Sequence, residues 1–325
     1  MRTKTLIIAV LCLALASTLF AQDPANPTPP AVGPVVSISL IVTDKDGKGI
    51  TTLRKEQVRV FEDKDEQTIL SLEADERPVD CVLLVDSSGS LRRLYPSVIE
   101  AAKLLIANRR PVDQIAVVRF VSTNIIEKTQ EFTSDDSLLK KALDNLYLEK
   151  GQSAVIDALY IGADYVAEHN KGNEERRKVA VIVTDGEDRI SYYKQQDLIK
   201  LLHQHGVQVF VLGLVVDLSD DKGFNKPGVK EKAEKLLKSV AEESGGRVFF
   251  PVKKEELVAS AAEIILDLRA QFRIKYQSTH DASKKGFRKL DVKFVSPDGE
   301  KRNMIFPRAY HVGPRTPPGK KSEKK

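Results

Sequence analysis

Two kinds of hydrophobic pattern divide the chain. Beyond the first 21 residues, continuous apolar runs such as CVLLV, IAVVRFV, VAVIV and VQVFVLGLVV occur within residues 80–268. Runs without alternation are typical of strands that are covered on both faces, as in a parallel sheet. Amphipathic helical patterns such as LYPSVIEAAKLLIANRR lie between them. Strands that alternate with helices predict an α/β fold with a doubly wound, mostly parallel, Rossmann-like sheet.

Alternation of apolar and polar residues marks several of the segments on either side of this region, and others read as short strands around turns. VVSISLIVT and QVRVFEDKDEQTILSL precede it, and FRIKY, KLDVKFV and NMIFP follow it. Period-two alternation predicts half-buried strands, and the acidic and glycine-containing stretches between them predict turns. Neither flank has enough strands to be stable alone. We therefore expect residues 35–79 and 269–312 to pair into one smaller β-sandwich-like domain, with the α/β domain inserted between them.

The two ends of the chain have a different character. Residues 1–21 hold two basic residues, then an apolar run shorter than a membrane span of ~20 residues, then Ala21. This is the order of a secretory signal peptide. Residues 22–34 predict a proline-rich linker, and residues 313–325 predict a basic disordered tail. We expect an exported protein, whether periplasmic, surface-attached or released, with no stable membrane insertion after cleavage; an uncleaved anchor is the alternative.

Composition narrows the classes of partner. The formal net charge of +5 comes largely from the two ends of the chain, and aromatic residues make up 6% with no Trp. A nucleic-acid-binding surface needs a basic folded face and stacking platforms, so the sequence argues against such a partner. After removal of the leader, Cys81 is the one cysteine left, so no internal disulfide is possible. Its apolar neighbours predict a buried thiol.

Residues with oxygen-bearing side chains gather where the apolar runs end. VLLVDSSGS leads one run into a cluster of hydroxyls around a carboxylate, VAVIVTDGED ends in another carboxylate, and EKGQSAVIDAL brings a hydroxyl to the start of a helix. Sites in open parallel sheets form at the carboxyl ends of strands, where such loops converge. An all-oxygen set suits a hard divalent cation, Mg²⁺ or Mn²⁺. The candidate metal ligands are Asp86, Ser88, Ser90, Ser153 and Asp185.

Catalytic interpretations of the same stretch find less support. A serine nucleophile needs a nearby base, but none of the five histidines lies in a segment that ends at this edge, and DSSGS lacks the G-x-S-x-G elbow. Neither glycine-rich phosphate-binding motif is present. His203 and His205 stand two apart on a predicted helix, face different directions and are expected on the surface rather than in a zinc pair. We therefore expect a protein that is not an enzyme.

Residues 80 to about 268 resemble the von Willebrand factor A-type domain, and DSSGS matches the D-x-S-x-S of its metal-ion-dependent adhesion site. The resemblance implies that all five candidate residues supply metal-contacting oxygens, with Ser153 at the position where the family usually has threonine. The flanking segments are similar to those of acidobacterial-type VWFA-related secreted proteins, so the resemblance covers most of the chain beyond the leader.

This resemblance implies binding rather than catalysis. An ion held by few carboxylates and several neutral hydroxyls keeps much of its charge and can take an acidic side chain of a partner protein as its last ligand. The expected function is therefore that of an exported, metal-dependent protein-binding or adhesion module. The alternative is a metal-free structural or scaffold protein that binds partners through the edges of its β-domain.

Overall fold

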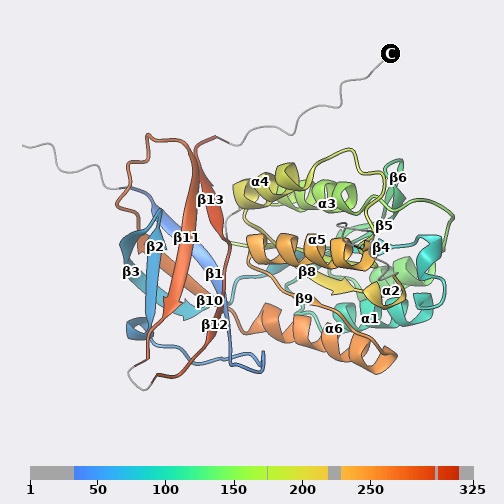
Figure 1. The fold of residues 1–325 in the computed structure, drawn as a ribbon, viewed down its shortest axis with the longest axis horizontal. Helices are drawn as coiled ribbons and strands as arrows, with labels where there is room; N and C mark the ends of the chain where they lie inside the picture. The colour runs from blue at the N-terminus through green and yellow to red at the C-terminus, as the bar shows by residue number, and fades with distance from the viewer. Residues whose placement is uncertain (1–32, 174, 219–227, 297–298, 315–325) are drawn as a thin grey trace, which may run out of the picture.

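The computed structural model describes residues 33–173, 175–218, 228–296 and 299–314. Within these ranges the strands form two sheets, one of six strands and one of seven, that lie side by side (Figure 1). The predicted signal peptide lies outside the described residues, as do nearly all of the predicted linker and basic tail.

The six-stranded sheet has the order β6-β5-β4-β7-β8-β9 and is parallel except at one edge. Its antiparallel edge strand, β6 (Ile125–Thr133), is only partly buried, so it lacks the apolar run that marks its neighbours. The parallel strands are β4 (Val79–Asp86), β5 (Gln114–Ser122), β7 (Arg177–Thr184), β8 (Val207–Gly213) and β9 (Val248–Phe249).

Three helices cover each face of this sheet (Figure 1). One face packs against α1 (Tyr95–Ala107), α2 (Asp136–Asp144) and α6 (Lys254–Arg269). The other packs against α3 (Val155–His169), α4 (Gln195–His205) and α5 (Val229–Ser244).

Strand β4 shows why the apolar runs do not alternate. All eight of its residues are buried, and alternate side chains enter the two opposite cores. Leu83 and Val85 belong to the core beneath α1 and α6, whereas Val82 and Leu84 belong to the core beneath α3. Both faces of the strand therefore require apolar residues, which confirms the prediction of a doubly wound α/β sheet.

The seven-stranded sheet is antiparallel throughout and joins the two flanks of the chain. Its order is β12-β1-β10-β3-β2-β11-β13, so strands from both flanks are mixed within one sheet. A β-sandwich-like arrangement of these strands, and the domain boundaries given above, stay predictions. The strands are β1 (Val35–Thr43), β2 (Val58–Glu62), β3 (Asp65–Ala74), β10 (Phe272–Gln277), β11 (Gly286–Phe294), β12 (Asn303–Ile305) and β13 (Ala309–Val312).

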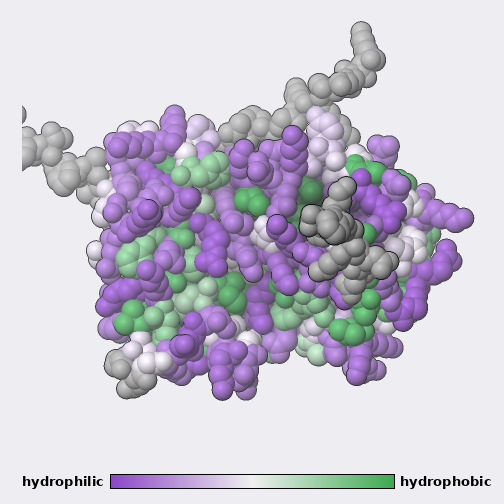
Figure 2. All heavy atoms as spheres, viewed as in Figure 1, coloured by the Kyte–Doolittle hydropathy of each residue, from purple (hydrophilic) through white to green (hydrophobic). Residues whose placement is uncertain are grey.

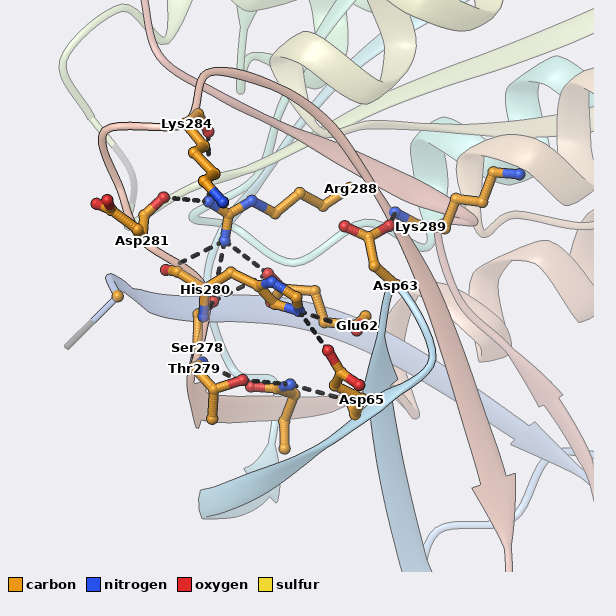
Figure 3. Close-up of polar contacts among 12 residues, drawn as sticks. Glu62, Asp63, Asp65, Ser278, Thr279, His280, Asp281, Lys284, Arg288 and Lys289 are labelled. Atoms are coloured by element: carbon orange, nitrogen blue, oxygen red, sulfur yellow. Dashed lines mark hydrogen bonds and ion pairs between the residues drawn. The ribbon is translucent and has the colours of Figure 1, made fainter. Parts of the chain in front are cut away.

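A buried polar cluster ties the two flanks together inside this sheet (Figure 3). The fully buried carboxylate of Glu62 accepts hydrogen bonds from Arg288 Nη1 at 2.7 Å, Tyr276 Oη at 2.8 Å and Ser278 Oγ at 2.9 Å. Burial raises the pKa of Glu62, but these hydrogen bonds outweigh it and leave that pKa below its ordinary value. The carboxylate and the guanidinium thus compensate each other's charge away from water.

The end of α4 lies between the two sheets, and this placement corrects one prediction. His203 and His205 are buried rather than on the surface, since α4 contacts β13 of the neighbouring sheet. His203 Nε2 lies 2.8 Å from the backbone oxygen of Glu243 in α5. Their burial depends on a strand about 100 positions later in the chain, which a local helical pattern does not reveal.

The visible exterior is polar. Figure 2 shows hydrophilic residues over most of one face, with apolar residues in scattered patches. Cys81 is buried, as predicted, and burial raises the pKa of its thiol to about 12. Among the described residues no helix has the length and apolar character needed to cross a membrane.

Candidate functional site

The parallel register of two central strands places the first candidate ligand. Val85 of β4 pairs with Val183 of β7, so Asp86 and Thr184 come next to each other where both strands end. Asp86 is fully buried, and its Oδ2 accepts a hydrogen bond from Thr184 Oγ1 at 2.7 Å. Its Oδ1 accepts one from the backbone N–H of Ser88 at 2.9 Å. Hydrogen bonds from the end of β7 and from the loop after β4 therefore fix the orientation of the Asp86 carboxylate.

A chain of hydroxyl contacts leads from this carboxylate toward solvent. Ser88 Oγ lies 2.9 Å from Ser90 Oγ, and the Ser90 hydroxyl is close enough to the Asp185 carboxyl group to lower its pKa. Ser88 and Asp185 are buried, whereas Ser90 is exposed. Ser90 and Asp185 line a cavity of about 380 Å³, together with Glu187 and apolar side chains that include Leu214. The hydroxyl-rich cluster therefore opens to a space that a ligand can enter.

Ser153 lies in the loop that precedes α3, and backbone hydrogen bonds fix this loop to the other two. The Ser153 backbone oxygen accepts from Arg189 N at 2.9 Å, and Glu149 N donates to Ser87 O at 2.9 Å. The Ser153 side chain is buried, with 6% of the residue exposed. The structure thus joins Asp86, Ser88, Ser90 and Asp185 through side-chain interactions, and backbone hydrogen bonds connect the loop that carries Ser153 to Ser87 and Arg189.

The electrostatics of the site are those of two carboxylates kept close together. Burial raises the pKa of Asp86, and the negative charge of Asp185 raises it further, to about 7. Burial also raises the pKa of Asp185, although the N–H of Glu187 and the Ser90 hydroxyl act against it. Each group therefore resists ionisation in the folded chain, and a cation between them would favour the charged form of both.

The nearby arginines already pair with other carboxylates. Arg119, which is fully buried on β5, bonds Glu127 at 2.9 Å and Glu149 at 2.7 Å. Arg189 bonds Glu187 at 2.7 Å. Both arginines thus direct hydrogen bonds to other carboxylates, although the positive charge of Arg189 also lowers the pKa of Asp185.

The donor set fits a hard divalent cation. The five candidate residues offer two carboxylates and three hydroxyls, all of them oxygen ligands. In the described part of the chain, no group of three or more His, Cys, Asp and Glu residues is placed to hold a metal ion. A metal here would therefore depend on the serine hydroxyls as much as on the carboxylates. The assignment of these five residues as ligands stays a prediction.

Two residues near the predicted ligands, Thr184 and Asp188, support the site through contacts that the sequence does not specify. Thr184 positions Asp86, and its place at the end of β7, directly before Asp185, was the available signal. Asp188 accepts a hydrogen bond from the N–H of Ile156 at 3.1 Å and so satisfies one free donor at the start of α3. No local pattern signals this contact, because the two residues lie 32 positions apart.

A comparison with known protein families agrees with the α/β fold described above. The von Willebrand factor type A domain family matches residues 80–263, which is more than half of the chain. The chain therefore belongs to the von Willebrand factor type A domain family, as the sequence predicted. No curated protein matches it.

Several solved structures are similar at low sequence identity. A von Willebrand factor type A protein from Catenulispora acidiphila is 12% identical, with 80% of this chain and 74% of that chain covered and a TM-score of 0.47. The open conformation of the pilus adhesin SpaC from Lactobacillus rhamnosus GG is 11% identical, with coverages of 83% and 48% and a TM-score of 0.46. Proximal thread matrix protein 1 from the mussel byssus, with a zinc-occupied MIDAS motif, is 20% identical, with coverages of 62% and 48% and a TM-score of 0.45.

Proposed function

We propose that this protein is an exported, metal-dependent protein-binding module. A divalent cation, Mg²⁺ or Mn²⁺, would be held by Asp86 and Asp185 with the hydroxyls of Ser88, Ser90 and Ser153, and it would accept an acidic side chain of a partner protein. The observation that carries the proposal is the pair of buried, mutually repelling aspartates beneath a cavity lined by Ser90 and Asp185.

The charges and the access route support binding rather than catalysis. Two carboxylates neutralise a divalent ion formally, but the remaining ligands are neutral hydroxyls, so the ion stays a strong acceptor for a further anionic ligand. The exposed Ser90 and the adjoining cavity give that ligand a path to the ion. Family membership supports an interaction module as well. Export, the acidic partner and the choice of Mg²⁺ or Mn²⁺ are parts of the proposal.

Thermal unfolding of the chain without its leader tests the metal site. At a Mg²⁺ or Mn²⁺ concentration ~100 times the dissociation constant, binding adds about 2.7 kcal/mol to the free energy of unfolding. The melting temperature should then rise by about 5–10 °C relative to chelator. Acetate, a carboxylate probe, should add a further rise when metal is present and none in chelator.

Three variants show whether this rise belongs to the proposed ligands. Asp86→Ala should abolish it, and Ser153→Ala should reduce it. Asp217→Ala is the matched control, because Asp217 lines the same cavity but pairs with Arg93 at its rim and is outside the ligand set. An equal rise in wild type and Asp86→Ala would refute the proposed site.

The alternative function is a metal-free scaffold that binds through the β-domain edges. No observation on the described residues specifically supports it. The two edge strands of the seven-stranded sheet, β12 and β13, have three and four residues. Short edge strands are a device that limits pairing with other chains. If metal does not change the melting temperature, the metal-free scaffold becomes the favoured function.

A further inference from the structure

The cavity beside the proposed metal site is lined by two kinds of side chain. Its volume of about 380 Å³ lies within the ~300–1,000 Å³ range of ligand pockets, which is more room than one carboxylate group needs. Ser90 and Asp185 belong to the polar part of its lining. Half of the described residues that line it are apolar, namely Leu91, Leu94, Leu214, Leu218 and Val229. We call these five residues the apolar lining.

Backbone hydrogen bonds attach the apolar lining to the strand ends that carry the predicted ligands. Leu91 N donates to Ser88 O at 3.2 Å, and Leu94 N donates to Leu91 O at 3.0 Å. On the other side, Leu214 N donates to the backbone oxygen of Thr184 at 2.8 Å. An apolar group and a carboxylate bound in this cavity would therefore meet surfaces that are held in a fixed relation to each other.

Part of the apolar lining is open to solvent. Leu91 and Leu214 are buried, but Leu94 and Leu218 are only half-buried, and Val229 is exposed. These last three residues keep apolar surface in contact with water when the cavity holds no ligand. Covering such surface with an apolar group is favourable in proportion to the area removed from water.

The charged residues of the lining have partners within the chain, apart from the proposed metal ligand. Glu187 pairs with Arg189 at 2.7 Å, and Asp217 accepts from Arg93 Nε at 3.2 Å. Asp185 belongs to the proposed metal site. The carboxylate of a ligand would therefore be drawn to the ion, while the rest of the ligand would meet apolar side chains.

We propose that the partner segment carries an apolar side chain close to its acidic one, and that this side chain packs against Leu94, Leu218 and Val229. The inference rests on the function proposed above and deepens it. An ion alone accepts any exposed carboxylate, and acidic residues are common on protein surfaces. Contact with the apolar lining would discriminate among acidic partners, because each methylene group that leaves water tightens binding about fourfold.

Short alkanoates separate the contribution of the ion from that of the apolar lining. The melting temperature of the chain without its leader, followed against ligand concentration in saturating Mg²⁺, gives dissociation constants for acetate and butyrate. Butyrate has two more methylene groups than acetate, so it should bind about tenfold or more tightly. Neither acid should bind in chelator, and butanol, which has the chain without the carboxylate, should not bind in Mg²⁺.

Variants of the apolar lining show whether this preference arises there. Leu94→Asn should reduce the preference for butyrate to about threefold or less, while the dissociation constants of Mg²⁺ and acetate stay those of the wild type. Leu218→Asn, in a different loop, should act in the same way. Leu138→Asn is the matched control, because Leu138 is an exposed leucine of α2 outside the cavity lining.

A measurement on the wild-type chain keeps the test decisive if neither variant folds. With Mg²⁺ present, butyrate should shift the methyl NMR signals of Leu94 and Leu218 more than acetate does, and leave those of Leu138 in place. Equal affinities for the two acids, an unchanged preference in both variants, or unshifted Leu94 and Leu218 methyl groups would overturn the inference alone. A chain that Mg²⁺ and Mn²⁺ do not stabilise would instead refute the proposed metal site, and this inference with it.

Discussion

Two buried carboxylates, Glu62 in the seven-stranded sheet and Asp86 at the end of β4, have the same exposure and opposite electrostatics. Both are fully buried. Glu62 faces Arg288 and the Ser278 hydroxyl (Figure 3) as well as the Tyr276 hydroxyl, and these hydrogen bonds lower its pKa despite burial. Asp86 faces Asp185, and burial together with that charge raises its pKa to about 7. Burial alone therefore does not show whether a carboxylate has a structural or a ligand-binding role; the identity of its partners does.

The two carboxylates also differ in the partners that the chain places around them. Glu62 receives a cation from β11, a phenol from β10 and a serine hydroxyl from the residue after β10. Asp86 receives two hydrogen-bond donors and a second carboxylate nearby. The charge of Glu62 is balanced by Arg288, whereas the charges of Asp86 and Asp185 would be balanced by a cation. Replacing each carboxylate by its isosteric amide therefore tests this distinction directly.

The largest effect is expected for Glu62→Gln. The amide leaves the Arg288 guanidinium buried without its counter-charge, and loss of one partner of a buried pair costs about 3–5 kcal/mol in free energy of unfolding. Urea denaturation at neutral pH measures this cost. Glu66→Gln is the control, since Glu66 is an exposed residue whose loss should change stability by less than about 0.5 kcal/mol. A loss below about 1 kcal/mol for Glu62→Gln would show that the pair is not structural.

A smaller effect of the same cluster appears in the pH dependence of stability. Because the folded-state pKa of Glu62 lies below its ordinary value of 4.5, the ionised carboxylate stabilises the fold above pH 4.5. This contribution is lost as the pH falls through the lower, folded-state pKa. The difference in unfolding free energy between wild type and Glu62→Gln should therefore shrink on acidification below pH 4.5. A difference that stays constant from neutral to acidic pH would contradict the assigned shift.

These two clusters also show which contacts the sequence can predict and which it cannot. DSSGS and VTDGED carry their chemistry in short contiguous stretches at the ends of apolar runs, so the candidate site could be proposed from local pattern and strand position. Glu62 and Arg288 lie 226 positions apart, and neither stands in a recognisable motif. Their pairing depends on the register of β2 with β11, which alternation alone does not specify.

The same limit applies where the two sheets meet and at the sheet edge. His203, His205 and Arg177 have the sequence surroundings of ordinary polar residues, and their burial arises where the two sheets meet. Strand β6 gives no apolar run, because an edge strand needs few apolar residues. Local periodicity therefore predicts the buried strands and helices, whereas contacts between segments distant in the chain leave no local signal.

Asp86→Asn, measured in chelator, should give the smallest change and the opposite sign. The amide oxygen can still accept from the N–H of Ser88, and the amide nitrogen can face the hydroxyl oxygen of Thr184. The repulsion from Asp185 disappears, so the free energy of unfolding at neutral pH should stay level or rise by on the order of 1 kcal/mol. The same variant should lose the stabilisation by Mg²⁺ or Mn²⁺ expected of the wild type. A loss in chelator as large as that of Glu62→Gln would mean that the Asp86 carboxylate is structural, and the distinction between the two buried acids would fail.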